Sequence, residues 1–216
     1  MGFDIILFDL DGTLTDPALG ITNSVAYALK KMGISPPDRK ELLKFIGPPL
    51  ASSFEKYYGL SKEEAFKAVD FYREYFAPKG IFENTVFEGI PEMLKELKNA
   101  GKTLALATSK PTVFADKILN HFNLSDYFDL TVGSNLDGTL TDKAEVVATV
   151  LQKLGAPDPK IAVMVGDRSH DIIGGAKNNL FTVGVTFGYG SKKELEDARS
   201  SKIAHSVDEL LQILLG

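Results

Sequence analysis

Hydrophobic residues recur along the chain with two different rhythms. Short continuous apolar runs, each bounded by glycine or polar residues, are typical of buried strands. Amphipathic stretches with apolar residues three or four apart separate most of these runs and predict helices. Strands that alternate with helices favour a parallel sheet with helices on both faces. The predicted strands are residues 5–8, 103–108, 128–133, 161–165, 182–187 and 203–206.

Residues 17–82 show only the helical rhythm. Ile21, Val25 and Leu29 recur at helical spacing, and Ser61 precedes Glu64 by the three residues of a capping box. We therefore predict an α/β fold, with a doubly wound, Rossmann-like parallel sheet built from residues 1–16 and 83–216. An all-helical cap domain of four helices, residues 17–82, interrupts this core after the first strand. Such an insert would act as a lid over the carboxyl ends of the strands.

Composition and charge exclude several classes of function. A net charge of −5 gives no electrostatic footprint for nucleic acid or an anionic membrane. The absence of cysteine excludes disulfides, thiolate catalysis and cysteine-ligated metals. The first apolar stretch is interrupted by Asp4 and ended by Asp9, which makes it too short for a signal peptide or a membrane span. A cytoplasmic location is the default expectation.

Candidate chemical groups follow several of the predicted strands. Asp9 and Asp11 follow the first strand, and Gly12 lets the chain turn so that the second carboxylate returns toward the first. Thr108 ends a later strand, Lys143 begins a helix, and residues 166–171 follow the run at 161–165. Ligands of parallel sheets bind beyond the carboxyl ends of the strands. Two close carboxylates suit a hard cation such as Mg²⁺.

In this order and context, the motifs resemble those of the haloacid dehalogenase superfamily of phosphatases. The first motif is Asp9-Leu10-Asp11-Gly12-Thr13, Thr108 and Lys143 match the second and third, and Gly166 to Asp171 matches Gly-Asp-x-x-x-Asp. Residues 45–50, 107–111 and 142–145 look typical of the phosphoglycolate phosphatase-like branch, whose members carry a helical cap. The resemblance covers nearly the whole chain. It implies a hydrolase of phosphoric monoesters.

The resemblance also implies a role for each motif residue. Asp9 would be the nucleophile that becomes an aspartyl phosphate, and Asp11 the general acid and base. Mg²⁺ would be held by the Asp9 carboxylate, the Asp11 backbone carbonyl and Asp167, with Asp171 supporting. Phosphoryl oxygens would be bound by Thr108, by Lys143 and by the amides of Leu10, Asp11 and Ser109.

Several residues bear on the choice of reaction and substrate. Asp11 favours phosphate esters over dehalogenation, because a halide needs no proton. Ile21 stands where β-phosphoglucomutases carry histidine, which argues against a phosphotransferase of that type. Ala144 follows Lys143 where many phosphoglycolate phosphatases have proline, which weakens the case for phosphoglycolate as the substrate. The alternatives are therefore a 5′-nucleotidase acting on nucleoside monophosphates and, from another class, a non-catalytic binding protein.

The partner implied is a small phosphorylated metabolite, and the chain is expected as a monomer or homodimer. Lys110 is expected on a loop near the substrate, and Lys44, Gly47 and Arg73 of the cap are candidates for substrate choice. Arg168 and His170 have no assigned role. Residues 136–142 copy residues 10–16 letter for letter, but Asn135 replaces the first acid, so we predict that this copy is only a turn.

Overall fold

The computed structural model describes residues 2–155 and 158–216. The chain divides into two compact units, which we call the α/β unit (the chain up to Asp16, with Val86–Gly216) and the helical unit (Pro17–Thr85). Residues 83–85 group with the helical unit, and Glu83 shows why, since its carboxylate accepts hydrogen bonds from Asn23 at 2.9 Å and Tyr75 at 3.2 Å. The chain passes between the units at β2 (Thr15–Asp16) and β3 (Thr85–Val86), which pair with each other.

The α/β unit contains a six-stranded sheet in the order β5-β4-β1-β6-β7-β8. Every neighbouring pair is parallel, which confirms the predicted fold class. β1 lies in the middle of the sheet, and Phe8, its last residue, is level with Leu106 of β4 and Val165 of β6. The chain segments that follow these strands therefore meet at one edge. The strands are β1 (Ile5–Phe8), β4 (Thr103–Pro111), β5 (Leu130–Ser134), β6 (Ala162–Gly166), β7 (Phe181–Val185) and β8 (Lys202–Ala204).

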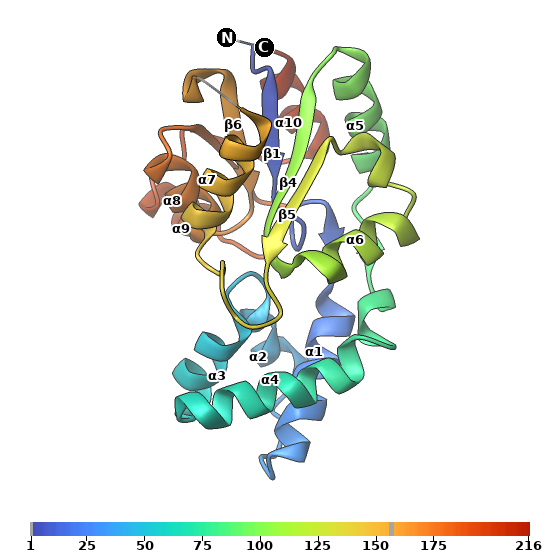
Figure 1. Cartoon of the computed structure of the whole chain (residues 1–216), viewed down its shortest axis with the longest axis vertical. Coiled ribbons are helices and arrows are strands. Elements are labelled where there is room, and N and C mark those ends of the chain that lie inside the picture. Colours follow the sequence, from blue (N-terminus) through green and yellow to red (C-terminus); the bar gives the residue numbers. More distant parts are fainter. Residues whose placement is uncertain (1, 156–157) are drawn as a thin grey trace. The chain divides into compact units, whose positions relative to one another are not determined.

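Helices cover both faces of this sheet (Figure 1). One face carries α5 (Ile90–Asn99), α6 (Thr112–His121) and α10 (Val207–Leu215), and the other carries α7 (Lys143–Leu154), α8 (Ser169–Lys177) and α9 (Lys192–Asp197). Alternate side chains of β1 serve the two faces. Ile5 and Leu7 share one buried cluster with Val146 and Val150 of α7. Because helices bury both faces of the sheet, its strands appear in the sequence as unbroken apolar runs.

The helical unit contains α1 (Ala18–Lys31), α2 (Arg39–Leu42), α3 (Leu50–Tyr58) and α4 (Lys62–Phe76). Short 3₁₀ turns at Leu43–Phe45 and Gly80–Phe82 complete it, and residues 17–84, all of them described, contain no strand. The capping box at Ser61 and Glu64 is formed in both directions, as predicted. No helix of the described chain is both long and apolar enough to cross a membrane.

One strand is longer than the sequence predicts. β4 continues through Pro111, so Lys110 lies on a strand and not on the expected loop. The cause is tertiary: after a shift of register beyond Ala107, Pro111 pairs with Ser134 of β5, and the Ser134 hydroxyl donates to the Ser109 carbonyl at 2.9 Å.

The second copy of the first motif is a turn, as predicted. The Gly138 amide donates to the Asn135 carbonyl at 3.2 Å. The exposed Asp137 carboxylate accepts hydrogen bonds from the amide and the hydroxyl of Thr139, at 2.9 and 2.7 Å. Asp137 thus serves its own turn, as Asx residues commonly do.

Candidate active site

Asp9 and Asp11 lie on a tight turn at the carboxyl end of β1. The Asp9 amide still pairs with the sheet, donating to the Val165 carbonyl at 2.9 Å. Beyond it the chain reverses, because the amides of Leu14 and Thr15 both donate to the Leu10 carbonyl, at 2.9 and 3.1 Å. Both carboxylates are buried, with exposed fractions of 3% for Asp9 and 8% for Asp11. A buried carboxylate must be paired with an opposite charge, bind a metal or be protonated.

Each of these carboxylates has its own buried lysine. The Lys143 ammonium lies 2.7 Å from Asp9 Oδ1 and also donates to the Ala107 carbonyl at 2.9 Å. The Lys110 ammonium lies 2.8 Å from Asp11 Oδ1. From the sequence, Lys143 was expected as the third-motif residue and Lys110 as a loop residue near the substrate. The structure gives them different partners.

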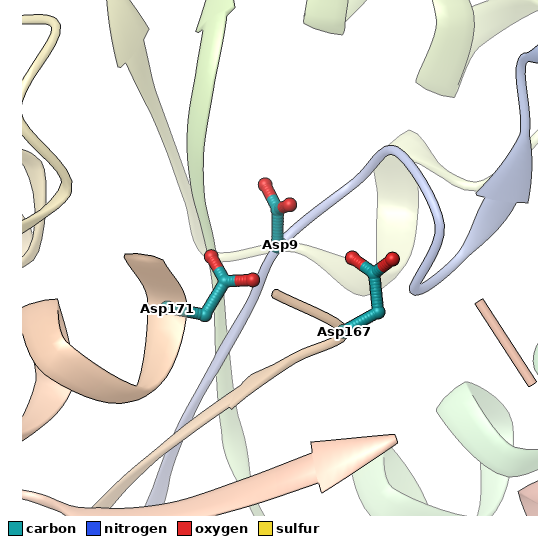
Figure 2. A group of neighbouring side chains, drawn as sticks. All are labelled: Asp9, Asp167 and Asp171. Atoms are coloured by element: carbon teal, nitrogen blue, oxygen red, sulfur yellow. The ribbon is translucent and has the colours of Figure 1, made fainter. Parts of the chain in front are cut away.

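A second group of carboxylates surrounds Asp9. Asp167 follows β6, Asp171 lies in the first turn of α8, and the two flank Asp9 (Figure 2). One ligand oxygen from each of the three residues lies within 4.8 Å of the others. Asp167 is fully buried, and its Oδ1 atom has no hydrogen-bond partner. Three buried carboxylates, with an unpartnered oxygen on Asp167, fit a hard cation such as Mg²⁺.

The pKa shifts of the cluster also favour a bound cation. Burial, together with the charges of Asp171 and Asp9, raises the pKa of Asp167 well above its ordinary value. Burial likewise raises the pKa of Asp171 to about 6, although Lys143 lies 2.9 Å away and opposes the shift. Burial would lower the pKa of Lys143, but the carboxylates of Asp171 and Asp9 outweigh it and raise that pKa. One ammonium therefore balances only part of the negative charge, and a bound cation would neutralise the rest.

Two glycines of the motifs make room for this cluster. Gly12 has a backbone φ of +84°, and a Cβ atom there would lie 2.3 Å from Asp167 Oδ2. A Cβ atom on Gly166 would lie 2.2 Å from the Asp171 carboxyl carbon. Any side chain at either position would displace a carboxylate. This is a steric reason for the glycines next to the acids in the first and fourth motifs.

The other core residues named from the sequence lie close by. The Thr108 hydroxyl is buried and accepts a hydrogen bond from the Lys110 amide at 3.2 Å. Arg168 joins α8 to α9, because its guanidinium lies 3.0 Å from Glu194 Oε1. Burial and the Arg168 charge lower the pKa of His170. The Arg168 ion pair thus links the start of α8 to α9.

The cap candidates lie in the helical unit. The Lys44 ammonium is 4.5 Å from the ring centroid of Tyr57, a cation–π contact. Gly47 has a φ of +101°. Arg73 lies on α4, 4.0 Å from Asp70 of the same helix. The assignment of Lys44, Gly47 and Arg73 to substrate choice stays a prediction.

Comparison with known proteins decides the family. The family model described as haloacid dehalogenase-like hydrolase matches residues 6–185, which span all four motifs. The chain belongs to this family. Proteins named as a 5′-nucleotidase, a phosphoglycolate phosphatase and a predicted phosphatase match 86% or more of it, and it is accordingly a phosphatase.

Three relatives and one solved structure show how similar this chain is to known proteins. A 5′-nucleotidase of Pseudomonas aeruginosa is 46% identical over 97% of this chain and 94% of its own. The tyrosine-protein kinase PtkA of Mycobacterium tuberculosis is 38% identical, over 97% of this chain and 72% of its own. A phosphoglycolate phosphatase of Aquifex aeolicus is 32% identical, over 86% and 85%. The crystal structure of a predicted phosphatase of Clostridium acetobutylicum superposes with a TM-score of 0.97, at 50% identity and over 100% and 99% of the two chains.

One segment of this haloacid dehalogenase-like site lies outside the four motifs and was not identified from the sequence. It is Gly188-Tyr189-Gly190, which follows β7 and contacts Asp167. The signal was a Gly-Tyr-Gly triplet just beyond a predicted strand, at the edge where the other motifs gather.

Proposed function

We propose that this haloacid dehalogenase-like phosphatase hydrolyses a small phosphomonoester through an aspartyl phosphate on Asp9, with Mg²⁺ as cofactor. The observation that carries the proposal is the pair of buried carboxylates, Asp9 and Asp11, each held by its own lysine beside a three-carboxylate cluster. Two neighbouring carboxyl groups with different partners can serve as nucleophile and as proton donor.

In the first half of the reaction, an Asp9 carboxylate oxygen attacks phosphorus while the ester bond to the leaving oxygen breaks. Asp11 donates its proton to that oxygen, and an alcohol leaves. Burial raises the pKa of Asp11, although Lys110 opposes this shift. The raised pKa favours a carboxyl group that can carry the proton. In the second half, Asp11 takes a proton from water, the water oxygen bonds to phosphorus, and the bond to Asp9 breaks. Inorganic phosphate and free Asp9 result.

The Asp9, Asp167 and Asp171 carboxylates and the Asp11 backbone carbonyl would hold the metal ion. When bound, Mg²⁺ supplies positive charge that lets an anionic nucleophile approach an anionic phosphate. Lys143, Thr108 and the amides of Leu10, Asp11 and Ser109 would bind the phosphoryl oxygens. Lys143 is suited to this because burial keeps its charge unscreened and its partners keep it protonated.

Substrate choice is proposed to reside in the helical unit. Its place in the chain, directly after the turn that carries Asp9 and Asp11, supports a role as a cap, with Lys44, Gly47 and Arg73 as candidate contacts. Nucleoside monophosphates are the first substrates to test, because the relative 46% identical to this chain is named a 5′-nucleotidase. Phosphoglycolate is the second candidate, since the 32% identical relative is named for that activity. A cytoplasmic enzyme, active as a monomer or homodimer, remains part of the proposal.

Hydrolysis of p-nitrophenyl phosphate, with Mg²⁺ and with chelator, tests the reaction. We expect turnover only with the metal; a folded sample that turns over equally in both would contradict metal dependence, and no turnover in either would contradict phosphatase activity on this ester. A panel of nucleoside monophosphates, phosphoglycolate and sugar phosphates then tests the substrate. The expected result is a higher kcat/KM for nucleoside monophosphates than for phosphoglycolate, and the reverse order would favour the second candidate.

Single substitutions test the role of the helical unit. Lys44→Ala and Arg73→Ala should raise KM for the preferred substrate more than for p-nitrophenyl phosphate, which offers the cap little to recognise. Equal changes for both esters would show that these side chains do not select the substrate.

A further inference from the structure

The Gly188-Tyr189-Gly190 segment contacts the candidate metal site from the carboxyl end of β7. Its central amide, that of Tyr189, donates a hydrogen bond of 2.8 Å to Asp167 Oδ2. The hydroxyl of the same tyrosine donates a hydrogen bond to the carboxylate of Asp16. Tyr189 therefore joins two parts of the α/β unit, the end of β2 and the acid that follows β6.

The two glycines let this segment approach very closely. A Cβ atom on Gly188 would lie 2.1 Å from the Gly12 carbonyl oxygen and 2.6 Å from Asp167 Oδ2. A Cβ atom on Gly190 would lie 1.8 Å from the Asp167 carbonyl oxygen. Backbone therefore packs directly on the acid, and no larger residue fits at either position. The segment therefore packs tightly against Asp167.

One carboxylate oxygen of Asp167 accepts a hydrogen bond, and the other does not. Oδ2 is held by the Tyr189 amide, whereas the buried Oδ1 atom has no hydrogen-bond partner. The same carboxylate contributes to the group that fits a metal ion with Asp9 and Asp171. A ligand carboxylate that is hydrogen-bonded through one oxygen is oriented by that bond, and loss of the orienting partner weakens metal binding.

We propose that Tyr189 is a positioning residue for the metal: its hydroxyl, anchored on Asp16, holds the segment so that its amide fixes the Asp167 carboxylate for the cation. The inference rests on the proposed function, because it needs the metal site that the proposal contains. The phenol is the donor in this bond, because a carboxylate oxygen accepts.

Isothermal titration calorimetry of the 216-residue chain with Mg²⁺ tests the inference without an activity assay. Tyr189→Phe keeps the ring and the amide but removes the hydroxyl, and the expected result is an affinity for Mg²⁺ about tenfold weaker. Asp16→Ala removes the acceptor and should weaken binding by a similar factor. Asp16→Asn keeps an acceptor oxygen and should restore most of the affinity.

The double variant Tyr189→Phe/Asp16→Ala shows whether the two residues act through one bond. If they do, it should bind Mg²⁺ no more weakly than either single variant, because the second substitution removes nothing further. Tyr27→Phe is the matched control. It removes a tyrosine hydroxyl that also donates to a carboxylate, that of Glu74 at 2.9 Å, but within the helical unit. Its affinity for Mg²⁺ should equal that of the unaltered protein.

The outcomes separate the inference from the proposed function. If the unaltered protein binds Mg²⁺ and Tyr189→Phe binds it equally well, even with reduced thermal stability, Tyr189 is only structural and the inference is wrong. Additive losses in the double variant would also contradict it, because the hydroxyl and Asp16 would then act separately. If the unaltered protein binds no Mg²⁺, the proposed metal site fails, and the inference fails with it.

Discussion

Replacing Lys143 with methionine removes an ammonium that pairs with both Asp9 and Asp171. The Lys143 ammonium lies 2.7 Å from Asp9 Oδ1 and 2.9 Å from Asp171 Oδ1, and all three side chains are buried. At an effective dielectric constant of about 20, each of these contacts represents a gross attraction of roughly 6 kcal/mol. Desolvation of the ammonium offsets much of this sum. Removal of one partner from a buried ion pair typically costs about 3–5 kcal/mol, because the remaining charge stays buried.

We therefore expect Lys143→Met to lower the free energy of unfolding by about 3–5 kcal/mol in chelator at neutral pH. Urea unfolding followed by circular dichroism measures this change. Saturating Mg²⁺ should recover a substantial part of the loss, because the cation neutralises the same carboxylates. The matched control is Lys98→Met, which breaks an ion pair of similar length, 2.8 Å to Asp129, whose side chains are 31% and 41% exposed.

The control should lose no more than about 1 kcal/mol, as is usual for exposed ion pairs, and Mg²⁺ should not restore it. Equal losses for Lys143→Met and Lys98→Met in chelator would refute the view that Lys143 neutralises a buried acidic cluster. A large loss at Lys143 that Mg²⁺ leaves unchanged would refute the link between this cluster and a metal.

Three further predictions use the near-copy of the first motif and the metal itself. Asp11→Asn should lower kcat for p-nitrophenyl phosphate by about 10²–10⁴-fold, the usual contribution of a general acid and base. Asp137→Asn, in the same Leu-Asp-Gly-Thr context, should leave the kinetics unchanged. Similar losses in both variants would show that the second copy takes part in the chemistry. Gly12→Ala should weaken Mg²⁺ binding in a calorimetric titration, because its Cβ would meet Asp167 Oδ2 at 2.3 Å. Gly138→Ala has nearly the same backbone φ, +85° against +84°, so normal Mg²⁺ binding by both variants would exclude a steric role for Gly12. Dialysis against chelator should abolish turnover and lower the melting temperature, and added Mg²⁺ should restore both; an unchanged melting temperature would count against a metal bound by Asp9, Asp167 and Asp171.

The sequence predicted the α/β fold and the grouping of its motifs for a simple reason. A strand buried on both faces must read as an apolar run, and the acid that ends it must lie at the carboxyl edge of a parallel sheet. Asp9 and Asp167 could therefore be assigned to one site from their positions after residues 5–8 and 161–165. The copy at Asp137 was correctly predicted as a turn, because Asn135 stands where the first motif has its first acid.

The remaining features depend on tertiary contacts that have no local signal. Lys110 lies on a strand only because β5 continues to pair beside it, and a single-sequence pattern ends that strand at Thr108. The contact of Lys143 with Asp171 requires α7 and α8 to begin side by side, which spacing alone does not specify. Tyr189 belongs to no motif, and its triplet indicates only a turn until the structure places its amide against Asp167.

Acid quenching during turnover of p-nitrophenyl phosphate with Mg²⁺, followed by borohydride reduction and peptide mass spectrometry, most directly tests the central proposal that Asp9 is the nucleophile. An aspartyl phosphate is an acyl phosphate, which borohydride reduces to the alcohol, so the expected product is homoserine at position 9. Asp9→Asn should yield neither turnover nor homoserine. Steady turnover with an unmodified Asp9, or reduction at another acid such as Asp11, would contradict the proposal.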